Sequence, residues 1–232
     1  MPEHEAAAQQ DRPTWKPEGE IATRMTGGNC TPYGLTTWGD LFTPRQLVAL
    51  TTFSDLVPEA IARIRADALA AGIPDDGREI DAGGNGATAY AKAVGLYLGI
   101  ALSRLTDICN ALCRWESSKT QVRNLFGRQS IPMMWDFAEN NLFAEAAGDY
   151  GVSLGNMVRA LLELPAAGNG SATQSDAQSQ TISASKVIST DPPYYDNIGY
   201  ADLSDFFYVW LRRSLRPVFP DLYATLAVPK AE

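Results

Sequence analysis

Apolar side chains recur every three or four residues in several segments of the chain, the spacing that places them on one face of a helix. The first such segment follows Thr43-Pro44-Arg45-Gln46, which provides a capping threonine, a proline at the first helical position and a glutamine three residues after the cap. An apolar stripe then continues to Gly72. The pattern predicts one long helix, which Pro58 can kink.

Three further segments have the same helical spacing. Residues 87–112 keep it longest, which predicts a central buried helix. Residues 154–164 predict a shorter helix that Pro165 ends, and residues 203–215 predict the last one. Residues 123–143 are aromatic and polar without a clear period, so we expect loops and short helices there.

Two stretches have the composition of poorly ordered chain. Residues 1–32 carry prolines, glycines and charges without an apolar period, and residues 166–185 are rich in Gly, Ser, Gln, Ala and Thr. A β-branched run at residues 186–190 then predicts a short buried strand, followed by a loop and the last helix. Strand, loop and helix form the unit of an α/β sheet, so we expect a lead-in (1–32), a mostly helical region (33–165) and an α/β region (166–232).

Charge and composition narrow the classes of protein. With 19 basic and 27 acidic side chains the net charge is −8, which excludes a uniformly basic protein that coats nucleic acid, so any such contact must be local. No apolar run is long enough to span a bilayer, and the polar start lacks a signal peptide, so we expect a cytoplasmic protein that contacts no membrane. Three cysteines without paired spacing fit a reducing compartment.

The segment with the clearest chemistry is Asp191-Pro192-Pro193-Tyr194, directly after the predicted strand. Two prolines stiffen the backbone and lack N–H groups, which leaves carbonyl oxygens free to accept hydrogen bonds beside the aspartate carboxylate. Fixed acceptors of this kind suit a ligand with an amino group, and the tyrosine offers a flat face for an aromatic ring. The alternative is a proline-stiffened turn at a strand end.

This tetrad resembles motif IV of the methyltransferases that use S-adenosylmethionine to methylate exocyclic amino groups, above all the adenine-specific DNA methylases. The longer string over residues 189–213 resembles a subgroup of large bacterial DNA methylases that carry an N-terminal domain of unknown function and are associated with phage defence. Weaker similarity extends through residues 38–46, 89–91, 126–129 and 135–139.

The resemblance implies an α/β fold in which a helix-rich N-terminal region packs on a partial Rossmann-like methyltransferase sheet. It implies that Asp191 and the carbonyl of Pro192, in a corner with Pro193, accept hydrogen bonds from the amino group of an adenine flipped out of DNA. Tyr194 would stack on that base. Further residues that would line the base pocket are Tyr195, Asn197 and Tyr200. Methyl transfer of this type requires no metal.

The resemblance also implies a cofactor contact at Asp176, with a short crossing in place of the linker; the alternative is a solvated loop aspartate. The family's glycine-rich cofactor loop has no good counterpart, because no strand precedes Gly83-Gly84-Asn85-Gly86, which we interpret as a lead into the long helix. We therefore expect a piece of a longer protein that holds the target-amino half of an active site. Its expected partners are DNA and the missing upstream half or other defence-system proteins.

Several alternatives remain open. The acceptor could be an amino group of RNA or of a protein glutamine, or the chain could be a catalytically silent interaction module that needs an upstream partner. Cys109 and Cys113 could share a metal, but buried thiols are favoured. Three arginines at the end of the last predicted helix could contact phosphates or belong to a solvated helix end: Arg212, Arg213 and Arg216. Four aromatic residues of that helix could form a base-stacking platform or part of the core: Phe206, Phe207, Tyr208 and Trp210.

Overall fold

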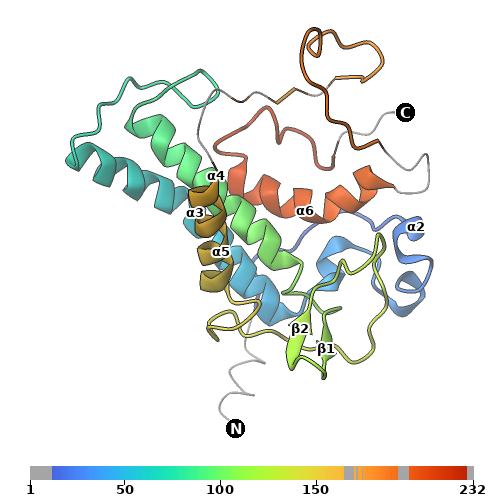
Figure 1. Ribbon diagram of the computed structural model, residues 1–232. Coiled ribbons are helices and arrows are strands. Elements are labelled where there is room, and N and C mark those ends of the chain that lie inside the picture. Colours follow the sequence, from blue (N-terminus) through green and yellow to red (C-terminus); the bar gives the residue numbers. More distant parts are fainter. Residues whose placement is uncertain (1–11, 165–169, 171, 174, 193–198, 229–232) are drawn as a thin grey trace.

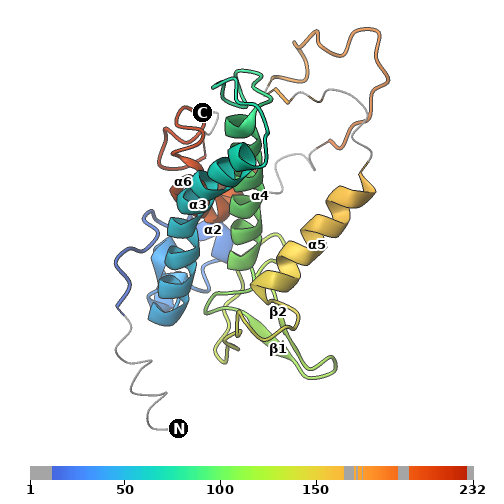
Figure 2. The same ribbon diagram turned by 90° about the vertical axis from the view of Figure 1, so that its left-hand side faces the viewer.

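The computed structural model describes residues 12–164, 170, 172–173, 175–192 and 199–228. Its elements are α2 (Thr23–Thr26), the 3₁₀ turns η1 (Thr31–Tyr33) and η2 (Trp38–Leu41), α3 (Pro44–Ala70), α4 (Ala87–Thr106), β1 (Arg114–Glu116), β2 (Gln121–Arg123), α5 (Tyr150–Glu163) and α6 (Tyr200–Leu215). Helices α3, α4 and α6 pack on one another, and α5 contacts α4 near its own start and then diverges from it (Figures 1 and 2). None of the described helices is long and apolar enough to cross a membrane.

Helix α3 begins with the predicted capping box. The backbone N–H of Gln46 donates to the hydroxyl of Thr43 at 3.2 Å, and the backbone N–H of Thr43 donates to the Gln46 side chain at 2.9 Å. The helix continues through Pro58 and ends at Ala70, close to the predicted end. The predicted stripe is buried from Leu47 to Val57 and partly buried at Ile61 and Ile64, so local patterning and tertiary packing agree best over the first half of the helix.

Helix α4 lies against α3 and α6 through small residues. Gly95 faces the side chain of Ile61 on α3, and Gly99 faces Leu215 on α6. The helix ends at Thr106, six positions before the predicted end at 112. The buried side chain of Asn110 explains the difference, because its amide donates to the carbonyl of Thr106 and its oxygen accepts from the next turn of the loop. The apolar residues beyond Thr106 therefore stay buried without remaining helical.

Helix α6 brings its aromatic face into the main core. Phe206 and Trp210 are fully buried, and Phe206 stacks on Phe42 with ring centroids 5.9 Å apart. Trp15 packs edge-on against Trp210 at 5.3 Å. These rings are core residues, which decides against a base-stacking platform on this face.

The segment before residue 33 differs from the predicted lead-in. Over residues 12–32 the chain supplies Ile21, Met25 and Cys30 to the main core, all at 5% exposure or less. The expectation of poor order does not describe these residues, because their apolar side chains are too far apart in the sequence to produce a periodic signal.

The described sheet is a two-stranded antiparallel hairpin in which Trp115 pairs with Val122. Mixed helix and strand agree with the predicted class at a coarse level, and a Rossmann-like sheet is not shown. The predicted buried strand at residues 186–190 is wrong for the chain by itself: Val187 is 101% exposed and Ile188 64%. A strand needs a neighbour to pair with, and no described segment pairs with this one.

The remaining segments follow the predictions more closely. Residues 124–143 form loops, as expected, whereas the hairpin just before them was not predicted. Helix α5 starts four positions before the expected residue 154, because the carboxylate of Asp149 accepts a hydrogen bond from the N–H of Val152 at 3.0 Å and caps it. The described residues between 172 and 185 are almost all exposed and lie outside the helical body (Figure 1).

Candidate functional site

The tetrad Asp191-Pro192-Pro193-Tyr194 lies only partly within the described residues. Asp191 and Pro192 are exposed, at the end of the unpaired segment that starts at Lys186. Pro193, Tyr194, Tyr195 and Asn197 are outside the described residues. The structure therefore shows the two ends of this loop, which we call the motif loop (residues 191–199), and not the contacts within it.

The far end of the motif loop is anchored by α6. Tyr200, the first residue of α6, is 49% exposed, so its ring is open to a ligand as a pocket-lining residue requires. Asp202, in the first turn, forms an ion pair with Arg24 of α2. The carboxylate of Asp205 accepts a hydrogen bond from the N–H of Val228 at 2.8 Å. Two buried carboxylates thus fix the helix start at which the motif loop ends.

Asp176 closes a local turn. Its side chain accepts a hydrogen bond from the backbone N–H of Gln178 at 2.9 Å, and its carbonyl accepts one from Gln180 at 3.0 Å. The carboxylate is exposed. This is the geometry of an Asx turn, in which a short acidic side chain satisfies the backbone of its own loop.

The glycine-rich segment at residues 83–86 packs closely against the backbone of residues 74–79. A Cβ added to Gly84 would lie 2.2 Å from the carbonyl oxygen of Arg78, and one added to Gly86 would lie 2.8 Å from that of Pro74. These glycines therefore allow one loop to pack closely before α4 begins. Neither this segment nor the exposed turn at Asp176 forms a cradle for S-adenosylmethionine.

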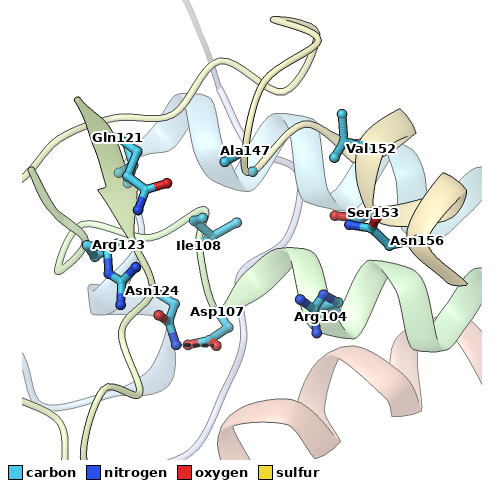
Figure 3. A pocket seen from close by; sticks show the side chains of 12 residues that line it. Arg104, Asp107, Ile108, Gln121, Arg123, Asn124, Ala147, Val152, Ser153 and Asn156 are labelled. Carbon is cyan, nitrogen blue, oxygen red and sulfur yellow. Dashed lines mark hydrogen bonds between the residues drawn. The ribbon is translucent and has the colours of Figure 1, made fainter. Parts of the chain in front are cut away.

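A hollow lies at the junction of α4, β2 and α5 (Figure 3). It encloses about 360 Å³, and Arg104 and Arg123 contribute to its lining. Asp107 accepts hydrogen bonds from the side chain of Asn124 and from the N–H of Phe126, each at 3.0 Å. The Asp107 carboxylate therefore holds the loop after β2 in place. Sequence reasoning missed this hollow because its residues come from three separate segments that share no motif.

The cysteines are buried thiols. Cys30, Cys109 and Cys113 are all free, and burial raises the pKa of each, that of Cys113 to about 12. Metal binding requires the thiolate, which these environments disfavour. Within the part of the chain that the structure describes, no group of three or more His, Cys, Asp or Glu side chains could hold a metal ion.

Two of the three arginines at the end of α6 make contacts within the protein. Arg212 donates to the carbonyl of Thr225 at 2.8 Å. Arg213 forms an ion pair with Asp55 at 2.6 Å, and its guanidinium lies 4.6 Å from the centre of the Trp15 ring. These two side chains hold α6 to its neighbours, which favours a structural role over phosphate contact.

Comparison of the chain with protein-family models, with curated proteins and with solved structures finds no match.

Proposed function

We propose that the chain provides the acceptor half of an S-adenosylmethionine-dependent amino-methyltransferase that acts on an adenine flipped out of DNA. The observation that carries the proposal is the tetrad at residues 191–194, which resembles motif IV. Asp191 and Pro192 are exposed, and the helix that follows the motif loop is anchored by an ion pair. A sealed, buried aspartate could not receive a base.

The chemistry asked of these residues is positioning. The carboxylate of Asp191 and the carbonyl of Pro192 each accept a hydrogen bond from the exocyclic amino group, which directs its lone pair toward a methyl donor. Tyr194 stacks on the base, and Tyr195, Asn197 and Tyr200 line its pocket. Holding the acceptor in line contributes most of the acceleration, because the displacement itself needs no covalent enzyme intermediate.

The donor half is proposed to lie outside the described residues. The glycines at residues 83–86 are closely packed against residues 74–79, and Asp176 reaches that cofactor only if its loop rearranges. Val187 and Ile188 are apolar, β-branched and exposed, as expected of a strand whose neighbours come from another polypeptide. We propose that this segment completes a Rossmann-like sheet with the upstream half of the enzyme or with another protein of a defence system. Three free cysteines support a cytoplasmic location.

The same exposed segment favours a second candidate, a catalytically silent module that uses residues 186–190 to bind a partner. An edge of unpaired backbone with apolar side chains is a common template for pairing with another chain. In that case Asp191 and the prolines only stiffen the end of the strand. The two candidates differ in whether the chain recognises an amino group.

Transfer of a labelled methyl group from S-adenosylmethionine to DNA, RNA and glutamine-containing protein separates these candidates. When the proposed donor half is supplied, the proposal predicts label in adenine of DNA and its loss in Asp191→Ala. Calorimetry should show weak or absent binding of S-adenosylmethionine by the chain alone. Tight cofactor binding would count against the silent module, and label in RNA or protein would reassign the acceptor.

A further inference from the structure

A concave surface beside α2 gathers positive charge in a chain whose net charge is −8. The hollow encloses about 590 Å³ and is lined by Arg24 of α2, Arg114 of β1 and Arg128 of the loop after β2. The amides of Asn29 and Asn124 also line it. No acidic side chain is among its described lining residues. We call this surface the arginine hollow.

Two of these arginines are available to a ligand. The side chains of Arg114 and Arg128 are exposed, and neither forms a hydrogen bond or an ion pair within 4 Å with a described residue, although the charge of Arg114 helps to lower the pKa of Glu116. Arg24 differs, because it pairs with Asp202 at the start of α6. Exposed guanidinium groups on a concave wall attract phosphate, which they can bind through two parallel hydrogen bonds.

The wall that carries Arg128 is held in place on both sides. Before it, the N–H of Phe126 donates to Asp107, and the ring of Phe126 packs on Phe206 with centroids 5.1 Å apart. After it, the N–H of the buried Ile131 donates to the carbonyl of Met25 at 2.8 Å. Because the loop is already ordered, a ligand that binds there loses little conformational entropy from the protein.

An exposed pair of aromatic rings includes the residue that follows the arginine hollow in the sequence. Met134 lines the hollow, and the following residue, Trp135, is 70% exposed. Its ring meets that of Tyr33, itself 59% exposed, edge-on with centroids 4.5 Å apart. The tryptophan thus keeps a face open to solvent while the tyrosine supports it. Arginines that meet a backbone and aromatic rings that stack on bases are the combination by which proteins hold single-stranded nucleic acid.

We propose that the arginine hollow binds an unpaired nucleic-acid strand, with phosphates at Arg114 and Arg128 and a base stacked on Trp135. The ion pair between Arg24 and Asp202 connects this surface to the helix on which the motif loop ends. The inference deepens the proposed function, because an enzyme that extrudes a base must hold the strand beside it. Binding of the strand does not itself require methyl transfer.

Fluorescence anisotropy with a labelled single-stranded DNA of about 12 nucleotides, titrated at several salt concentrations, tests the inference. The double variant Arg114→Ala/Arg128→Ala should bind about tenfold more weakly at low salt, and the slope of log affinity against log salt should become shallower by about 1.4. Trp135→Ala should weaken binding about tenfold without changing that slope. Circular dichroism of each variant confirms that it is folded.

Matched controls remove the same groups elsewhere. Arg63→Ala/Arg159→Ala takes two exposed arginines from α3 and α5, and Tyr90→Ala takes an exposed ring from α4. Both should leave the affinity within about twofold of wild type. Absence of strand binding by the wild-type chain, or an equal loss in the control variants, would overturn the inference.

Two further measurements separate this inference from the proposed function. Asp191→Ala should keep its affinity for a strand that contains no adenine. Intact strand binding without methyl transfer, even when the proposed donor half is supplied, would reject the methyltransferase and leave the hollow as assigned. An RNA of the same sequence that binds equally well supports the shared chemistry of phosphate and base. Tighter binding of the duplex than of the single strand would overturn the base contact at Trp135.

Discussion

Arg24 and Asp202, which are 178 positions apart in the sequence, form an ion pair that joins α2 to the first turn of α6. The side chain of Asp202 is only 7% exposed, whereas that of Arg24 is 68% exposed. A carboxylate in this position is also stabilised by the N-terminal end of the helix dipole. The pair therefore fixes the end of the motif loop to the wall of the arginine hollow.

Replacing Arg24 with alanine should remove the guanidinium that pairs with the buried Asp202 carboxylate. We expect the free energy of unfolding to fall by roughly 1–2 kcal/mol, less than for a fully buried pair because Arg24 is largely in solvent. Urea denaturation measures the change. The exposed pair of Arg63 and Asp67, with 3.9 Å between nitrogen and oxygen, provides the control, and Arg63→Ala should cost less than about 0.5 kcal/mol. Equal losses would show that the buried carboxylate does not depend on Arg24.

Two glycines in helices should respond to alanine in opposite directions. A Cβ at Gly95 would lie 2.3 Å from Cγ1 of Ile61, so Gly95→Ala should destabilise the protein by roughly 1–3 kcal/mol through overpacking of α4 on α3. Gly155 on α5 has no atom within 4 Å of such a Cβ, and Gly155→Ala should stabilise by about 0.5–1 kcal/mol. Thermal unfolding tests both, and Ile61→Ala should recover part of the loss in Gly95→Ala. Stabilisation by both alanines would contradict the close α3–α4 contact.

The loop before α4 should weaken in acid through Asp75. Hydrogen bonds from the side chain and backbone of Thr88, joined by Arg65, lower the pKa of Asp75 from 3.8 to about 2. Because the folded-state pKa lies below the unfolded value, the stabilising effect is present above pH 3.8 and is lost as the pH falls toward 2. Asp75→Asn should melt at a lower temperature than wild type at pH 7, and this difference should close by about pH 2. A gap that stays constant over this range would contradict the assignment.

The segment before the tetrad should exchange its amide hydrogens rapidly. Residues 187–192 make no backbone hydrogen bond with any described residue, whereas the amides of α6 are bonded within a packed helix. Hydrogen exchange followed by mass spectrometry should show early deuteration of peptides that cover residues 187–190 and strong protection of residues 206–214. Comparable protection of the two segments would show that the strand is paired within the chain.

Local signals predicted the helical part of the fold well. The capping box at Thr43 and Gln46 and the apolar stripe after it are encoded within a few residues, so α3 is where the pattern places it. Helix α4 shows the limit of the same reasoning. Its apolar spacing continues past Thr106, but the Asn110 side chain replaces the helical hydrogen bonds, and periodicity alone does not detect such a replacement.

The candidate site depends on contacts that no local pattern reveals. The β-branched run at residues 186–190 has strand propensity, but a strand forms only beside another strand, and that neighbour is a tertiary property. Likewise, the arginine hollow combines Arg24, Arg114 and Arg128 from three separate segments. The anchoring of Phe126 and Ile131 places Arg128, and the pairing of β1 with β2 places Arg114; both are properties of the folded chain.

Recognition of an amino group by Asp191 is the central claim for the proposed function, and a comparison of binding to two DNA strands tests it directly. Single-stranded DNA with one adenine is compared by fluorescence anisotropy with the same strand in which purine, which lacks the exocyclic amino group, replaces the adenine. The account predicts that the wild-type chain binds the adenine strand about tenfold more tightly and that Asp191→Ala binds both equally. Equal binding of the two strands by wild type, or a preference that survives in Asp191→Ala, would contradict it.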